Sequence, residues 1–177
     1  MIKKIEIKFE AVEMMLYYWQ SIAEREKVAE SYLIEVADNE DMNYCYNMEF
    51  SPESVRKVLS AISNRELLNN ATKAEKKFWN CNMWMVEDLD NMNNMVKPVK
   101  MLNLDYFVEK LNEKDSKYEN IEVHFIPGHE EEYRIEDNKL IVNFFKLMIN
   151  PMDETDIKIS GQPFKEYMEE KLIELIS

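Results

Sequence analysis

The spacing of apolar residues divides the first fifty residues into segments of different kinds. Residues 3–9 alternate between charged and apolar side chains, and this period of two predicts a β-strand. Over residues 11–23 the apolar side chains recur with helical spacing. Residues 31–41 fit either a continuation of that helix or an irregular segment. Alternation returns over residues 42–50, so we expect a second strand there.

Local sequence signals mark where the next two helices begin. Ser51 can cap a helix N-terminus, and Pro52 suits the first helical position because its missing N–H is not needed there. Thr72 and Glu75 have the spacing of a capping box, in which each side chain accepts a hydrogen bond from the other residue's backbone. We expect this second helix to run to about Val96 and to end before the next proline.

The rest of the chain combines helices with strands. The predicted order is a helix over residues 104–113, a strand over 121–126, a hairpin over 132–149 that turns at Asp137–Asn138, a short strand over 155–160 and a terminal helix that begins at Pro163. No internal repeat or low-complexity linker separates these segments. We therefore expect residues 1–177 to form one domain, helix-rich to about residue 114, with the hairpin and terminal helix after it.

These elements predict an α+β fold. We expect a mostly antiparallel sheet of about four to six strands, packed against several helices. One long helix, rich in methionine and tryptophan, would lie centrally between the sheet and the other helices.

The long helix is apolar around more than half of its circumference. On a helical projection Trp79 and Met83 lie on one flank of the central apolar stripe, and Trp84 and Met95 lie on the other. The fold itself could cover both flanks, which is the more common role of such stripes. Alternatively, a flank could contact a partner, since tryptophan anchors interfaces and methionine adapts to irregular surfaces. The four residues are therefore our candidates for an interface or for a ligand pocket.

The acidic composition limits the classes of partner. The chain has 22 Lys and Arg against 35 Asp and Glu, a net charge of −13. Repulsion from phosphates argues against nucleic acid and anionic membranes as partners. The charge favours a basic protein partner, although solubility alone would also explain it. The N-terminal residues resemble a strand more than a signal peptide, and no apolar run is long enough to span a membrane, so we expect a cytoplasmic protein.

The sequence lacks the motifs of the common catalytic sites. Phosphate-binding loops need several glycines, and this chain has 2 in total. Cys45 and Cys81 lie in patterned segments without a recognisable catalytic motif, and we interpret both as buried thiols. We therefore lean towards a protein without enzymatic activity and without a cofactor.

The two histidines form the weak exception. His124 lies on the predicted strand over 121–126, and the Pro-Gly turn that follows could bring His129 back towards it, with Glu131 close in sequence. Two imidazoles and a carboxylate suit zinc or non-haem iron, although this spacing matches no established ligand pattern. A solvated loop is the simpler interpretation.

Three functional hypotheses follow. The leading one is a module that binds another macromolecule, either a second copy of itself or a basic protein, for example as an inhibitor or immunity-type protein. The second is a metal-dependent hydrolase that uses His124 and His129. The third is a small-ligand-binding domain with an apolar pocket lined by the region of Trp79 and Trp84.

Overall fold

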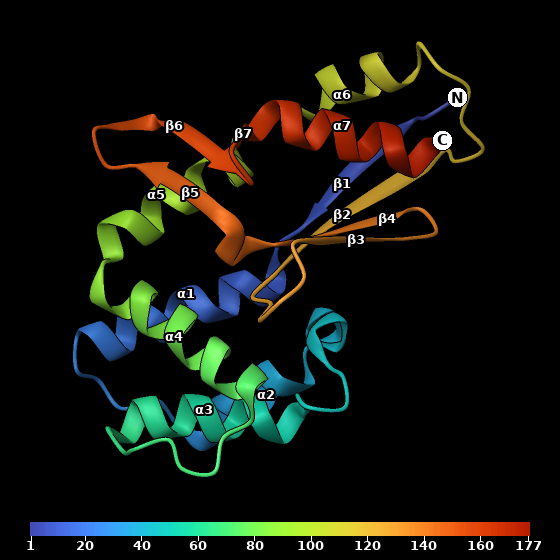
Figure 1. The fold of residues 1–177 in the computed structure, drawn as a ribbon. Helices are drawn as coiled ribbons and strands as arrows, with labels where there is room; N and C mark the ends of the chain where they lie inside the picture. Colours follow the sequence, from blue (N-terminus) through green and yellow to red (C-terminus); the bar gives the residue numbers. More distant parts are fainter. The chain divides into compact units, whose positions relative to one another are not determined.

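The computed structural model describes residues 1–177 and confirms the α+β class. The chain forms two compact units, and each of them combines segments that are distant in the sequence (Figure 1). Unit 1 comprises Met1–Lys8, Asn93–Phe125 and Glu132–Ser177, and unit 2 comprises Phe9–Met92 and Ile126–Glu131. A single folding domain stays a prediction, because the contacts inside each unit do not determine whether the two unfold together.

Unit 1 contains both β-sheets. The strands of the four-stranded sheet, in spatial order, are β1 (Lys4–Lys8), β2 (Asn120–Ile126), β4 (Lys139–Asn143) and β3 (Tyr133–Glu136). The strands of the three-stranded sheet, in spatial order, are β5 (Leu147–Asn150), β6 (Asp153–Ile159) and β7 (Gln162–Pro163). β1 pairs with β2 in parallel, whereas β3 and β4 form an antiparallel hairpin that turns at Asp137–Asn138 as predicted. The hairpin ends at Asn143 and not at residue 149, because β5 belongs to the other sheet. The four-stranded sheet is thus mixed, and the strands divide into two sheets where we expected one.

Two helices of unit 1 pack on the four-stranded sheet. α6 (Leu104–Leu111) contacts β1, and α7 (Phe164–Ile176) contacts β4. The two helices also contact each other and lie side by side over the sheet (Figure 1). The predicted terminal helix is present as α7, and the residues of its inner face are buried: Phe164, Tyr167, Met168, Leu172 and Leu175. A short 3₁₀ turn, η2 (Phe144–Lys146), joins the two sheets.

Unit 2 is helical. Its elements are α1 (Glu10–Ala23), α2 (Glu30–Asp38), the 3₁₀ helix η1 (Glu40–Cys45), α3 (Pro52–Asn64) and α4 (Lys73–Glu87). The ambiguous segment after α1 is therefore a separate helix. α3 contacts both α2 and α4, and α1 also contacts α4. The helix signals at Ser51 and Thr72 are both confirmed, since each side chain accepts a hydrogen bond from the backbone N–H of the third residue of its helix.

The predicted strand over residues 42–50 is wrong. Residues 40–45 form η1, and Asn47 and Phe50 make only an isolated bridge. In a 3₁₀ helix residues three apart share a face, and Met42 and Cys45 are indeed both buried. Met48, which the alternation placed beside Met42, is fully exposed.

The long Met/Trp-rich helix is also not confirmed. The predicted helix divides at Asp88 into α4 and α5 (Leu89–Lys100). Asp88 has an extended backbone (φ −141°, ψ 81°), which ends α4. Its carboxylate then accepts a hydrogen bond of 3.0 Å from the N–H of Asn91 and caps the next helix. The expected end before Pro98 is wrong as well, because α5 contains this proline and continues for two more residues.

Candidate functional site

The break at Asp88 separates one of the two pairs that we expected to share a flank, Trp84 and Met95. Trp84 lies on α4 in unit 2 with its side chain 66% exposed, whereas Met95 lies on α5 in unit 1 and is buried. Trp79 and Met83 lie together on α4, and both are half-buried. The structure thus brings together one of the two predicted pairs. Their role in an interface stays a prediction.

The inner side of α4 is held by a buried polar contact. Asn82 is fully buried and accepts a hydrogen bond of 2.8 Å from the indole N–H of Trp19 on α1. The amide of Asn82 also donates to the carbonyl oxygen of Phe78, one turn earlier. Buried amides need such partners, since an unsatisfied polar group in the interior costs free energy. Asn82 therefore acts as a structural residue that fixes α4 on α1.

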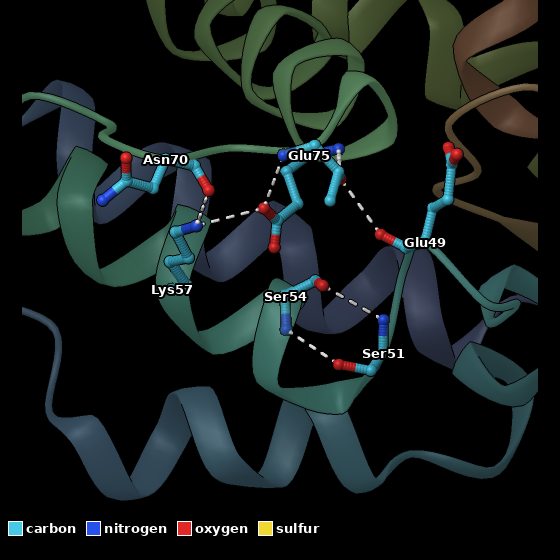
Figure 2. Close-up of polar contacts among 7 residues, drawn as sticks. Glu49, Ser51, Ser54, Lys57, Asn70 and Glu75 are labelled. Carbon is cyan, nitrogen blue, oxygen red and sulfur yellow. Dashed lines mark hydrogen bonds and ion pairs between the residues drawn. The ribbon is translucent and has the colours of Figure 1, made fainter.

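A second polar network surrounds Glu75 at the start of α4 (Figure 2). Its carboxylate accepts hydrogen bonds from the backbone N–H of Thr72, at 2.9 Å, and from the ammonium group of Lys57, at 3.1 Å. Lys57 also donates to the carbonyl oxygen of Asn70, while Ser51 and Ser54 exchange hydrogen bonds at the start of α3. The network thus ties α3 to the loop that precedes α4.

The environment of Glu75 identifies it as a structural acid. Burial alone would raise the pKa of this carboxyl, but hydrogen bonds from Thr72, Ser54 and Lys57 outweigh burial and lower it. A general acid at neutral pH needs the opposite shift. In the same unit, burial raises the pKa of the Tyr18 hydroxyl, which donates a 2.6 Å hydrogen bond to the carbonyl oxygen of Leu59. Both groups stabilise helix packing.

The histidines lie in separate units. His124 is buried on β2 in unit 1, with its Nε2 atom 3.6 Å from a carboxylate oxygen of Glu122. His129 is buried in unit 2, where its Nε2 atom lies 2.8 Å from the carbonyl oxygen of Cys45 and its ring packs against Phe50. The side chain of Glu131 is exposed. No group of three or more His, Cys, Asp or Glu side chains is placed to hold a metal ion, so the structure does not assemble the suggested ligand set.

The negative charge is concentrated in unit 2. This unit holds 8 Lys and Arg against 18 Asp and Glu, a formal charge of −10. Unit 1 holds 14 against 17, a formal charge of −3. The charge of the protein is thus a property of its helical unit.

Within unit 2, residues 28–55 form what we call the acidic segment. It covers α2, η1 and the start of α3 and carries seven acidic residues without a single Lys or Arg. Six of the seven are exposed: Glu30, Glu35, Asp38, Glu40, Glu49 and Glu53. The other one, Asp41, is buried. The total charge of the chain does not reveal this segment, whereas a count of charges along the sequence does.

Two apolar side chains are exposed within the acidic segment. Ile34 on α2 is 37% exposed, and Met48 after η1 is completely exposed. Each has an exposed glutamate as its neighbour in sequence, Glu35 and Glu49 respectively. Exposed apolar groups among charges of one sign are the components of a surface that attracts a partner by charge and holds it by apolar contact.

Comparison with known proteins assigns no family. No protein-family model, no curated protein and no solved structure matches the chain. None of the helices combines the length and the apolar character needed to cross a membrane.

Proposed function

We propose that this protein is a non-catalytic binding module of the cytoplasm that recognises a basic protein through its acidic segment. The single observation behind the proposal is the run of seven acidic residues without a basic one over residues 28–55, six of them exposed. A field of one sign accelerates the encounter with a partner of opposite charge and disfavours nucleic acids and anionic membranes. An inhibitor or immunity-type protein for a basic target would have these properties.

The acidic segment also favours a different protein over a second copy of the same chain. In a symmetric dimer the same patch lies on both sides of the interface, so two acidic segments would face each other. Carboxylates that face each other across an interface repel. A basic partner removes the repulsion and pairs carboxylates that the fold leaves exposed.

The contributions of charge and apolar contact differ in kind. Exposed ion pairs contribute mainly to the rate of association and weaken as salt increases. Ile34 and Met48 contribute apolar area, which depends little on salt and lowers the rate of dissociation. The complex should therefore form fastest at low salt, while a salt-insensitive part of the affinity remains.

Affinity isolation with matched variants tests the proposal. The baits are the natural protein, the triple variant Glu35→Gln/Asp38→Asn/Glu40→Gln and the control triple Glu26→Gln/Glu66→Gln/Glu87→Gln. All six positions are exposed residues of unit 2, and only the first three belong to the acidic segment. Both triple variants change the net charge equally, so a nonspecific charge effect would affect them alike.

We expect the natural protein and the control triple to recover the same basic protein from native extract, and the acidic-segment triple to lose it. If no partner is recovered, or if both triples lose it equally, the proposal fails. Equal thermal unfolding temperatures of the three baits show that each is folded.

A further inference from the structure

Unit 1 contains a cavity that the proposed function does not use. Its volume is about 510 Å³, within the range of roughly 300–1,000 Å³ that is typical of small-molecule sites. The walls come from α5, the connection from α5 to α6, α6, β6 and the start of α7. The residues that line it all belong to unit 1, and Figure 1 shows the elements that carry them.

The inner surface of this cavity is apolar. Phe107 on α6 and Phe164 at the start of α7 line it with side chains that are almost fully buried, and Ile157 on β6 and Pro98 on α5 add further apolar surface. Phe164 also packs against the ring of Phe125, with 6.2 Å between the ring centroids. The apolar surface therefore belongs to the core of unit 1 and is preformed for an apolar group.

Two lysines lie at the edge of the same cavity, Lys97 from α5 and Lys165 from α7. The ammonium group of Lys97 donates to the amide oxygen of Asn94 at 3.3 Å. That of Lys165 lies 3.9 Å above the ring of Tyr106. Neither lysine forms an ion pair with a carboxylate, in a chain that has 35 Asp and Glu residues. The two positive charges therefore remain available to an anionic ligand.

The ring of Tyr106 and the start of α7 lie beside Lys165. Tyr106 donates its hydroxyl hydrogen to Glu169 at 3.2 Å, which orients the ring below the lysine. α7 begins at Phe164, and its N-cap residue, Pro163, makes no side-chain cap. The positive end of the helix dipole thus points to the edge at which Lys165 lies.

Glu154 is the one acidic residue in the cavity lining, so the charges of the lining side chains sum to +1.

We propose that this cavity binds a small amphipathic carboxylic acid. The apolar body of the ligand lies against Phe107, Phe164 and Ile157, and the carboxylate pairs with Lys97 and Lys165. An uncharged ligand of the same shape would leave both ammonium groups without a counter-ion, so the site discriminates by charge. This inference concerns unit 1 and is independent of the protein partner proposed for unit 2.

Calorimetric titration with two acids and their alcohols tests the proposal. The probes are octanoate against octanol and hydrocinnamate against the corresponding alcohol. Each pair has the same apolar body and differs in the charged group. We expect at least one acid to bind with a dissociation constant in the millimolar range or below, about tenfold more tightly than its alcohol, as charge-assisted contacts at a partly exposed site allow.

Lysine variants identify the source of the discrimination. The double variant Lys97→Gln/Lys165→Gln is expected to weaken binding of the acid about tenfold, to the level of the alcohol, and to leave the alcohol unchanged. Lys158→Gln, an exposed lysine on β6 outside the lining, is the charge control and should leave both affinities unchanged. Ile157→Trp, which fills the cavity from a half-buried position, should remove binding of both probes.

Three results would overturn the proposal. The first is the absence of binding for both acids, and the second is equal affinity for each acid and its alcohol. The third is equal loss of affinity in the double lysine variant and in Lys158→Gln. Because these titrations contain no protein partner, their failure leaves the proposed function of the acidic segment unaffected, and the reverse also holds.

Discussion

The two units use polar side chains in different ways. In unit 2, Asn82 is hydrogen-bonded to Trp19 and Glu75 to Lys57 inside the fold, while most of its 18 acidic residues lie on the surface. Unit 1 is close to neutral, yet it leaves Lys97 and Lys165 without carboxylate partners beside an apolar cavity. We propose that the acidic surface of unit 2 binds a protein partner and that the two lysines of unit 1 bind a ligand.

The largest change in the free energy of unfolding is expected for Phe78→Ala, which also tests whether the two units unfold together. Phe78 in unit 2 is fully buried and packs edge-on against Phe50 at 5.0 Å, so Phe78→Ala should lower the free energy of unfolding by about 4 kcal/mol through lost contacts and a cavity. All three tryptophans lie in unit 2. Tryptophan fluorescence therefore reports on this unit alone, whereas far-ultraviolet circular dichroism reports on both.

If residues 1–177 form one domain, urea unfolding followed by the two signals should give coincident transitions, and Phe78→Ala should shift both equally. Leu67→Ala, at a position that is 85% exposed, should change the midpoint very little, by less than about 0.5 kcal/mol. If the fluorescence transition of Phe78→Ala shifts while its dichroism shows a second phase that does not shift, the two units unfold separately. This result would contradict a single domain.

The next prediction concerns how much the buried hydrogen bond between Asn82 and Trp19 stabilises unit 2. Asn82→Ala removes the acceptor for the indole N–H of Trp19 in a fully buried place, and we expect a loss of about 2–3 kcal/mol in urea unfolding. Asn80→Ala, on the exposed side of the same helix, is the matched control and should cost less than about 0.5 kcal/mol. Equal losses would show that helix propensity, and not the buried hydrogen bond, determines the result.

A smaller effect, dependent on pH, is expected at Glu75. Its folded-state pKa lies below the ordinary value, so the charged carboxylate stabilises the fold at neutral pH, and this contribution disappears as the pH falls below about 4.3 towards the lowered pKa. Glu75→Gln should cost about 1–2 kcal/mol at neutral pH, and the difference from the natural protein should shrink in acid. Glu66→Gln, at an exposed position, should show no such pH-dependent difference. A Glu75→Gln difference that stays constant with pH would contradict this role.

The smallest expected effect concerns the helix that leads from unit 2 to unit 1. Asp88→Ala removes the side-chain cap of α5 and should cost about 1 kcal/mol in thermal or urea unfolding. Asp90→Ala removes an exposed acid from the first turn of the same helix, where only the helix dipole is affected, and should cost a few tenths of that. If the two variants behave alike, Asp88 does not act as the cap.

Sequence reasoning succeeded where a local signal determines the structure. The start of α3 was predicted correctly, because Ser51 and Pro52 act within their own helix turn. It failed over residues 42–50 because two asparagines compete with strand formation. The side chain of Asn39 accepts a hydrogen bond from the backbone of Asp41, and that of Asn47 accepts one from Glu49. Such contacts stabilise turns, and the apparent alternation of apolar residues does not reveal them.

The functional features were harder to predict for a different reason. The helical period continues across Asp88, so a projection of residues 78–96 places Trp84 and Met95 on one flank although the helix breaks between them. The cavity of unit 1 needs side chains from α5, α6, β6 and α7, whose proximity no local pattern encodes. Only the acidic segment was visible in the sequence, as a run without basic residues.

Hydrogen exchange of the protein, alone and with the basic partner obtained by affinity isolation, tests directly whether the acidic segment is the binding surface. We expect backbone amides over residues 28–55 to exchange more slowly in the complex, most strongly around the exposed Ile34 and Met48, while exchange in unit 1 is unchanged. Protection centred on another surface, or the same exchange rates with and without the partner, would contradict the claim that the acidic segment is the binding surface.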